Sequence, residues 1–435
     1  MRTFPGWQSV LVCLAGAFLA QCTDSGPSGG TPSTNVPVGA QLVKSDVPQD
    51  SAPAATAAQV AALGESNRAF AFELYGELGK SSGNLFFSPQ SISTALAMIY
   101  AGARTTTETE MRNTLHFGAD QTLLHAAFNA TGLALAQRKT QLAPMSEGTG
   151  FELTVVNQAW GDKQASFLDP YLDVLAKNYG AGLFLVDFAK APDAARLLIN
   201  NWVAEQTKDR IKDLLAAGSI DSNVLLVLTN AIYFKASWLS KFDPSKTQSG
   251  TFHAQAGDRP VPMMKQVIEA RYAQSADYQA VELPYVSPSV RMLVISPAQG
   301  RFDAVAQALG STFDAIRVGL STYTVTLAMP KLSFESTPKL KPALQALGMN
   351  EAFTDRADFS GLDGKRDIFI FDVVHKAFVA IDEAGTEAAA ATAVISGTVS
   401  LKPQATLTLD RPFIFLVYDD PTGEVLFLGR FSDPG

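Results

Sequence analysis

Residues 383–392 read Glu-Ala-Gly-Thr-Glu-Ala-Ala-Ala-Ala-Thr, and no other segment of the chain says as much about its fold. Four consecutive alanines favour a helix. Small side chains that alternate with threonine also suit a strand that must enter a crowded sheet. The composition of this run is compatible with both a helix and a strand. The sequence of the surrounding segments is needed to decide between them.

Further segments on either side of this run follow one another in a fixed order. They are Asn84-Leu-Phe-Phe-Ser-Pro-Gln-Ser-Ile-Ser-Thr-Ala-Leu-Ala-Met98, Asn230-Ala-Ile-Tyr-Phe-Lys-Ala-Ser-Trp238, Val281-Glu-Leu-Pro-Tyr285, Met329-Pro-Lys-Leu-Ser333, Val374-His-Lys-Ala-Phe378, Arg411-Pro-Phe413 and Leu426-Phe-Leu-Gly429. In order and spacing they resemble the serpin family over most of the chain, and residues 383–392 resemble the serpin hinge. Each segment alone is a weak signal, but their joint order is specific.

The resemblance implies the serpin fold: an α+β single domain with three β-sheets, about eight or nine helices and an exposed reactive-centre loop. Helical spacing early in the chain and short strands later are independently typical of an α+β protein. No Pro/Gly/Ser-rich break interrupts residues 58–435, so they are predicted to form one domain. Strands are predicted at Leu85–Phe87, Val224–Phe234, Val290–Ser296, Val325–Met329, Ile368–Phe371 and Phe413–Tyr418, and helices at Ala54–Gly79, from Ser88 to Gly102, Ala191–Leu215 and Lys339–Gly348.

Composition and charge limit the classes of function. The chain is 47% hydrophobic and 17% charged, which is ordinary for a soluble globular protein with a large core. Its net charge is -8 and it has no long run of basic residues, so nucleic acid is not expected as a partner. The four histidines show no metal-ligand spacing. We therefore expect no metal, no cofactor and no enzyme activity.

Residues 1–22 have the features of a signal peptide. The apolar run Val10–Ala20 is too short to span a membrane as a helix. Leu19-Ala20-Gln21-Cys22 resembles a bacterial lipobox, in which the cysteine is lipidated after cleavage, although Gln21 departs from the usual small residue. Ordinary cleavage nearby with free secretion is the alternative. We expect an exported protein, either attached to the cell envelope through a lipid on Cys22 or secreted.

Residues 23–57 are rich in Ser, Gly, Thr, Pro and Ala, which is the composition of a flexible linker. The only two cysteines, Cys13 and Cys22, lie in the leader. Residues 58–435 therefore contain no disulfide, no thiol nucleophile and no thiolate metal site. Their stability must come from packing.

The serpin resemblance gives residues 383–392 a role, because serpin loops insert into the main sheet of the fold. If Glu387 points outward on an inserting strand, a period of two places small, uncharged residues inward, as insertion requires. The alternative is a flexible or helical alanine run without that role. The predicted hinge residues are Glu383, Gly385, Thr386, Glu387, Ala388, Ala389, Ala390, Ala391 and Thr392.

The resemblance also places the reactive bond between Val399 and Ser400, because inhibitory serpins keep a fixed spacing from the hinge glutamate to the residue before the cut. Valine before the cut suits a protease with a small apolar pocket, of the elastase type. Thr398 and Leu401 are the alternatives for that residue. After cleavage the loop would insert as a new strand and carry the protease along as an acyl-enzyme.

Two groups of residues would control the opening of the sheet, again by resemblance. The first, the shutter, would be a buried hydrogen-bonded cluster of Ser88, Ser91, Asn200, Asn230 and His375. The second, the breach, would lie at the top of the sheet and contain Trp238 and Lys331, with Lys331 paired to Glu383 before insertion. As isolated residues, the two serines would be helix caps and the histidine an ordinary core residue.

These patterns predict an inhibitory serpin that traps a serine protease of the elastase or chymotrypsin type. The target protease, held as a covalent acyl-enzyme, is the expected partner, and the protein is expected to be a monomer. A non-inhibitory serpin, cleaved as a substrate and acting as a binding or storage module, is the first alternative. Charged or bulky residues in the hinge would favour it. A hydrolase is the second alternative, and it would need a nucleophile with a partnered base, which the sequence does not show.

Overall fold

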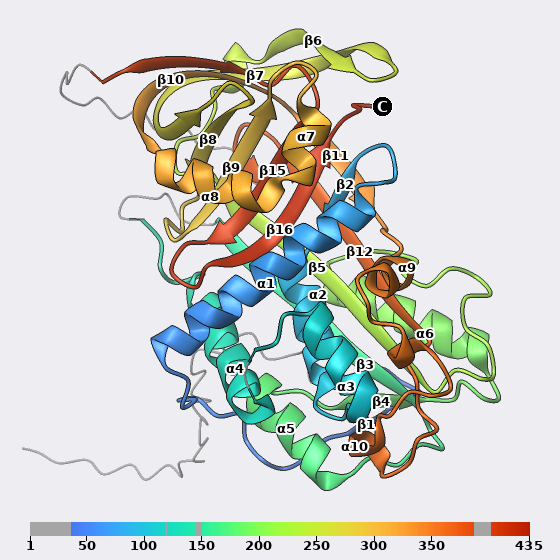
Figure 1. Cartoon of the computed structure of the whole chain (residues 1–435). Helices are drawn as coiled ribbons and strands as arrows, with labels where there is room; N and C mark the ends of the chain where they lie inside the picture. The colour runs from blue at the N-terminus through green and yellow to red at the C-terminus, as the bar shows by residue number, and fades with distance from the viewer. Residues whose placement is uncertain (1–35, 119, 144–149, 387–401) are drawn as a thin grey trace, which may run out of the picture.

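A computed structural model of the chain describes residues 36–118, 120–143, 150–386 and 402–435. Figure 1 shows the helices of the first half of the chain packed beside long strands, with most of the shorter strands gathered at one end. The α-helices of the described residues are α1 (Ala57–Leu78), α2 (Pro89–Tyr100), α3 (Thr105–Thr114), α4 (Gln121–Gln137), α5 (Asp169–Tyr179), α6 (Pro192–Gln206), α7 (Phe302–Gln307), α8 (Leu309–Gly319), α9 (Leu340–Ala346) and α10 (Ser360–Asp363). No helix in these parts of the chain has the length and apolar character needed to cross a membrane.

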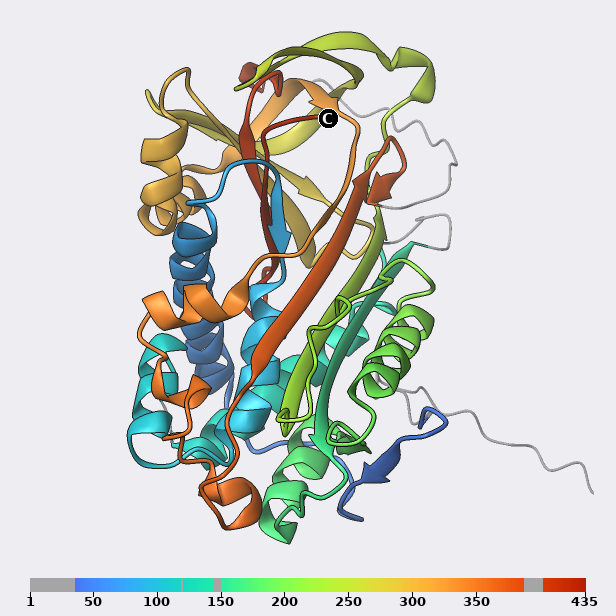
Figure 2. The same cartoon turned by 90° about the vertical axis from the view of Figure 1, so that its right-hand side faces the viewer.

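The first sheet has seven strands in the order β1-β4-β3-β5-β13-β12-β11. Their bounds are β1 (Gln41–Val43), β3 (Phe151–Asp162), β4 (Leu183–Val186), β5 (Leu226–Ser237), β11 (Leu332–Ser336), β12 (Asp372–Ile381) and β13 (Gly385–Thr386). The central strand β5 is buried along almost its whole length. It is covered on both faces, because α2 packs against β3 and β5 on one side and α6 packs on the other (Figure 2).

The second sheet has the strand order β14-β10-β7-β8-β9-β15-β16-β2, with β6 paired to β7. Their bounds are β2 (Leu85–Phe87), β6 (Gln248–Ala254), β7 (Gly257–Gln274), β8 (Tyr278–Pro284), β9 (Val290–Pro297), β10 (Ser321–Pro330), β14 (Gln404–Thr408), β15 (Phe413–Asp419) and β16 (Glu424–Phe431). The predicted α+β class is confirmed. Two of the three expected sheets form one hydrogen-bonded sheet here, because β7 is 18 residues long and pairs with β6, β10 and β8 in turn.

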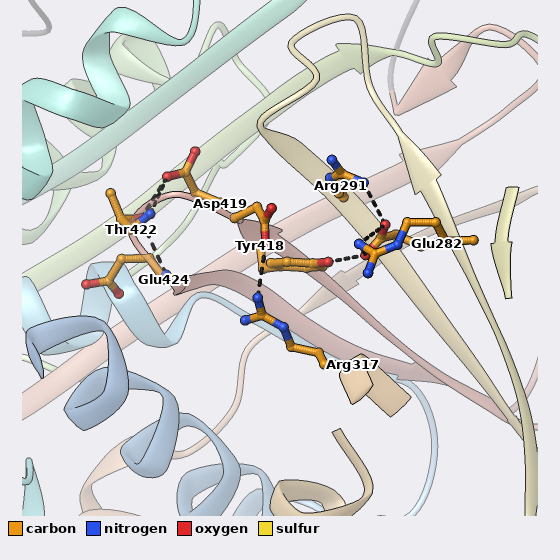
Figure 3. A network of polar contacts seen from close by, with 9 residues as sticks. Glu282, Arg291, Arg317, Tyr418, Asp419, Thr422 and Glu424 are labelled. Carbon is orange, nitrogen blue, oxygen red and sulfur yellow. Dashed lines mark hydrogen bonds and ion pairs between the residues drawn. The ribbon is translucent and has the colours of Figure 1, made fainter. Parts of the chain in front are cut away.

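A buried polar network ties the second sheet to the helices that cover it (Figure 3). Tyr418 donates a hydrogen bond to the Glu282 carboxylate, and the Arg317 guanidinium of α8 lies 5.8 Å from the centre of the Tyr418 ring. Burial raises the pKa of the Glu424 carboxyl to about 8, and Asn67 of α1 donates to this carboxyl at 2.9 Å. The network fixes α1 and α8 on the second sheet. It involves none of residues 383–386.

Parts of the N-terminal segment that the structure describes pack against the first sheet and against α5. β1 pairs antiparallel with β4, and Leu42 lies opposite Phe184. Farther on, Ser45 Oγ donates to Asp173 Oδ1 at 2.5 Å, and Asp50 N donates to a backbone carbonyl of α5 at 2.9 Å. This corrects the flexible linker predicted for residues 23–57 over its described part, because its backbone and polar side chains find partners on β4 and α5.

Most local predictions match the structure, and two do not. The strand Leu85–Phe87 and the Ser88 cap of α2 are confirmed. The predicted strand Ile368–Phe371 is wrong, because the chain is irregular there and β12 begins at Asp372. The helix predicted to reach Leu215 ends at Gln206, since Lys208 and Asp209 both have positive φ angles, 52° and 61°.

Candidate functional site

The candidate site is a seam in the seven-stranded sheet where β5 and β12 are partly separated. Along Val227–Ile232 and Asp372–Ala377 the two strands are direct parallel neighbours. Farther along, β13 lies between them and pairs antiparallel with both: Gly385 is opposite Ser237, and Thr386 is opposite Ala236 and Ile381. Figure 2 shows β12 and β5 side by side down the front of the sheet. The start of residues 383–392 is therefore already a short strand within this sheet.

Gly385 is required at the point where the chain enters the seam. Its φ angle is 153°, and a Cβ atom at this position would lie 2.1 Å from the carbonyl oxygen of Ala236. A larger residue would push β13 away from β5. The next residue, Thr386, is buried, and its hydroxyl hydrogen-bonds the Tyr285 hydroxyl at 2.8 Å. Thr386 thus faces the interior, as the predicted alternation requires.

The predicted breach residues surround this entry point. Trp238 stacks on Tyr285 with ring centres 4.7 Å apart, and its indole N–H donates to the carbonyl of Asp382 at 3.1 Å. Lys331 Nζ donates to Glu383 Oε2 at 2.7 Å, which is the pair that the resemblance implied. Both residues therefore hold the turn through which the chain passes from β12 into β13.

Glu383 is fastened from two sides. Thr247 Oγ1 donates to its Oε1 at 2.7 Å, while Lys331 bonds the other carboxylate oxygen. Partial burial alone would raise the pKa of the Glu383 carboxyl, but these hydrogen bonds outweigh it and hold the pKa below its usual value. The carboxylate is therefore charged at neutral pH.

Below β13, four of the five predicted shutter residues form one hydrogen-bonded cluster. The Ser88 backbone N–H donates to His375 Nε2 at 3.2 Å, and His375 Nδ1 lies 2.5 Å from Asn230 Oδ1. The Asn230 amide in turn donates to Ser91 Oγ at 2.5 Å. Burial lowers the pKa of His375 to about 3, so the ring is neutral at physiological pH. Since Nε2 accepts a bond, the proton lies on Nδ1 and is donated to Asn230.

Asn157 completes this cluster and was not predicted. Its Oδ1 accepts hydrogen bonds from Asn230 Nδ2 at 2.5 Å and from Ser91 Oγ at 3.0 Å. Strand pairing places Asn157, Asn230 and His375 in one row across β3, β5 and β12. The signal in the sequence was the polar pair Asn157-Gln158 after two valines in β3, but the partner of Asn157 becomes evident only from the strand register.

Asn200 makes its hydrogen bonds to Leu215 and not to the residues of the cluster. It is buried on α6, and its side-chain amide donates to the carbonyl of Leu215 at 2.9 Å while its Oδ1 accepts from the Leu215 N–H at 2.8 Å. These two bonds fasten the segment that returns from α6 across the sheet. Within the described residues, the structure therefore gives Asn200 a different role from the shutter role predicted for it.

The remaining predicted residues lie outside the described part of the chain. These are the hinge residues 387–392, the reactive bond Val399–Ser400 and the lipidation site Cys22. Among the residues that the structure does describe, no group of three or more His, Cys, Asp or Glu side chains is arranged to hold a metal ion.

Comparison with known proteins agrees with this geometry. The family model for serpin (serine protease inhibitor) matches residues 65–434, and the chain belongs to the serpin family. An uncharacterized serpin-like protein of Thermococcus kodakarensis is 41% identical over 369 residues, 84% of each chain. The leukocyte elastase inhibitor of Sus scrofa is 37% identical over 387 residues, covering 86% of this chain and 99% of its own. The crystal structure of uncleaved ovalbumin is 27% identical with a TM-score of 0.74, covering 86% of this chain and all of its own. The serpin fold predicted from the sequence is confirmed.

Proposed function

We propose that this serpin inhibits serine proteases of the elastase or chymotrypsin type by a suicide mechanism, in which the cleaved loop inserts into the seven-stranded sheet. The observation that carries the proposal is β13. Thr386 lies between β5 and β12 with its side chain buried, at the head of the path that the rest of the loop would follow.

The path beyond Thr386 suits an inserting strand. β5 and β12 run parallel to each other there, and β13 is antiparallel to both, so a strand that continues β13 would pair with both neighbours. Residues 388–393 are all Ala or Thr, and an inserting strand with Thr386 inward would direct Glu387 outward. Insertion would part His375 from Asn230, while Asn157 and Asn230 would stay together on β3 and β5; the His375–Asn230 bond and the backbone ladder beside it therefore hold the seam closed.

The energetics favour trapping once the reactive bond is cut. About fifteen inserted residues at about 3.3 Å each would move the attached protease by roughly 50 Å. Each ladder hydrogen bond gained contributes about 0.5–1.5 kcal/mol. Losing one oxyanion-hole donor slows acyl-enzyme chemistry by roughly 10² to 10³. Distortion of the oxyanion hole of the protease alone would be enough to stall deacylation.

The target class rests on the sequence of the loop and on the relatives. Val399 is the residue that the spacing from Glu383 selects, and valine fits a small apolar specificity pocket. Leukocyte elastase inhibitors are among the curated relatives, at 35–37% identity. Both observations favour an elastase-like protease over a trypsin-like one.

A titration tests the proposal directly. The protein without residues 1–22 is incubated with neutrophil-type or pancreatic elastase, and the products are separated on a denaturing gel and identified by mass spectrometry. The expected result is a covalent complex and a C-terminal fragment that begins at Ser400. Cleavage without any complex would leave the family assignment intact and move the function to that of a non-inhibitory serpin.

We also propose that the protein is exported and attached to the cell envelope by a lipid on Cys22. The lipobox-like Leu19-Ala20-Gln21-Cys22 after an apolar run supports this. Expression with a labelled fatty acid should label the protein in the membrane fraction, and Cys22→Ser should remove the label. Unlabelled protein in the medium, with the same N-terminus for both forms, would instead indicate secretion after ordinary cleavage.

A further inference from the structure

We propose that a cavity at the end of the seam remote from β13 binds an apolar molecule that carries one carboxylate, and that this ligand opposes the opening of the seam. The binding site stands on its own geometry, whereas its effect on loop insertion rests on the inhibitory function proposed above. Binding and inhibition therefore need separate measurements.

The walls of the cavity come from both sides of the seam. The cavity has a volume of about 550 Å³ and is lined by residues of segments 214–219, 337–342 and 371–375. Segment 371–375 contains the start of β12, and segment 337–342 leads from β11 into α9. Segment 214–219 lies between α6 and β5 along the chain, and Asn200 of α6 bonds it at Leu215. The cavity therefore joins the β12 side of the seam to the β5 side.

Buried apolar side chains form much of the lining. Leu214, Leu215, Leu340 and Val373 are all buried, and Phe371 adds a partly exposed aromatic ring. Small-molecule sites are mostly apolar, with a few polar groups, and typically measure about 300–1,000 Å³. The cavity therefore suits an aliphatic chain or a small ring system.

Two lysines give the lining its positive charge. Lys341 Nζ donates to the carbonyl of Phe371 at 2.9 Å, and within the described residues neither Lys341 nor Lys339 forms an ion pair. An ammonium group has three donors, so Lys341 retains donors for a ligand. The lining contains one carboxylate, that of Asp372, which accepts a hydrogen bond from the Val373 N–H at 2.8 Å. The excess of one positive charge favours a ligand with a single negative charge.

A buried hydroxyl in the lining lacks a partner. Ser219 Oγ is shielded from solvent and makes no hydrogen bond within the described part of the chain. Leaving a buried hydroxyl without a partner is costly, so the site is improved by a molecule that accepts this bond. A carboxylate oxygen is such an acceptor, and an ordered water molecule is the alternative.

Occupancy of the cavity would oppose insertion, because insertion moves its walls apart. Val373 of β12 lies opposite Leu228 of β5 in the parallel ladder. Thr386 lies opposite Ala236, so a strand that continued β13 would reach Leu228 after eight further residues, well within the proposed insertion. A ligand that contacts both walls binds the closed seam and not the opened one, and it therefore stabilises the closed form.

A titration with octanoate tests the site, with octan-1-ol as the uncharged control. Binding to the full-length protein is followed by NMR of the ligand, and octan-1-ol should bind more weakly. Lys341→Gln should weaken octanoate binding by about tenfold, the size of one hydrogen bond to a charged group. Ser219→Leu places a larger side chain in the cavity and should abolish binding. Lys163→Gln, at an exposed lysine outside the cavity, is the matched control and should bind like the wild type.

The effect on the seam is measured as the stoichiometry of inhibition of elastase. At ten times its Kd, a ligand specific for the closed form disfavours opening by about elevenfold. Octanoate at this concentration should therefore raise the stoichiometry for the wild type, as more inhibitor is cleaved without forming a complex. Ser219→Leu should show no such rise, which also controls for any action of octanoate on the protease.

Each part of the inference has its own contrary result. No saturable binding of octanoate, or binding that Lys341→Gln and Ser219→Leu both leave unchanged, would overturn the site and leave water as the partner of Ser219. Equal binding of octan-1-ol would overturn the carboxylate as the ligand class. Octanoate that binds without raising the stoichiometry would overturn the effect on the seam. If the wild type forms no complex with elastase- or chymotrypsin-type proteases, the inhibitory function fails, and the titration still decides the site. Lys339→Gln repeats the test should Lys341→Gln fail to fold.

Discussion

Two regions of the seven-stranded sheet differ in how their strands are joined: the seam between β5 and β12 in its interior, and the outer edge at β4. At the seam, a buried row of polar side chains, Asn157, Asn230 and His375, bridges the strands, and β13 already separates them at one end. At the outer edge, β1 closes the sheet through backbone pairing. The seam also has a parallel backbone ladder between Val227–Ile232 and Asp372–Ala377, but a new strand that continues β13 would replace this ladder with pairing to both neighbours. At the outer edge, β1 already occupies the corresponding place beside β4.

The outer edge is also closely packed. A Cβ atom on Gly182 would lie 2.6 Å from the carbonyl oxygen of Val43, so the N-terminal segment and the chain leading into β4 approach as closely as only glycine permits. Val36 and Ala40 pack against the buried cluster that contains Trp160 and residues of α6. Under the proposed insertion, the sheet would widen in its interior at the seam while its margin at β4 stays closed by β1.

Thr386→Arg should abolish inhibition. Thr386 is buried between β5 and β12, so a long charged side chain there would have to leave the seam or be buried without a partner. The variant is expected to be cleaved by elastase as a substrate, with complete loss of the covalent complex on a denaturing gel. Thr109→Arg, at an exposed position on α3, is the control and should inhibit normally. An unchanged complex for Thr386→Arg would refute insertion at this seam.

Asn230→Ala should weaken the closed seam. The substitution removes the acceptor for His375 and the donor for Ser91 and Asn157, so three buried groups lose a partner. We expect a loss of about 2–4 kcal/mol of unfolding free energy, from more than one unsatisfied buried group, and faster loss of inhibitory activity on warming. Thermal unfolding and residual inhibition after timed incubation measure both effects. Asn223→Ala, at an exposed position before β5, serves as the control; equal behaviour of the two variants would mean that the cluster does not hold the seam.

Removal of residues 23–50 should destabilise the outer edge without affecting insertion. The deletion loses the β1–β4 pairing and the bonds from Ser45 and Asp50 to α5. A few hydrogen bonds at about 0.5–1.5 kcal/mol each give an expected loss of about 1–3 kcal/mol in unfolding free energy. Removal of residues 23–35 alone retains β1 and is the control. The stoichiometry of inhibition should be the same for both, and a rise for the longer deletion alone would show that the edge also restrains the seam.

The seam could be predicted better than the edge because the serpin resemblance covers it. The hinge start, the Lys331–Glu383 pair and the cluster of Ser88, Asn230 and His375 came from that resemblance, since isolated residues of these types are equally typical of helix caps and ordinary cores. Asn157 depends on the register between β3 and β5, which is a long-range pairing that no local pattern fixes. β1 is a three-residue strand in a segment of low complexity, where packing against β4 overrides a composition typical of linkers.

Glu383→Gln should have the smallest effect and should depend on pH. Hydrogen bonds from Lys331 and Thr247 hold the pKa of the Glu383 carboxyl below its usual value in the folded protein. Its contribution to stability is therefore present above the unfolded-state value near 4.3 and is lost as the pH falls through the lowered folded value. Because Lys331 is 39% exposed, the loss on substitution at pH 7 should be below about 1 kcal/mol. Unfolding temperatures measured from pH 3 to pH 7 should show wild type and variant converging at the acid end.

Glu335→Gln, which removes a more exposed carboxylate paired with Lys376, is the control. If only Glu383→Gln also shortens the life of the active inhibitor at pH 7, then the entry point of the loop, and not the polar row below it, is where the seam first gives way.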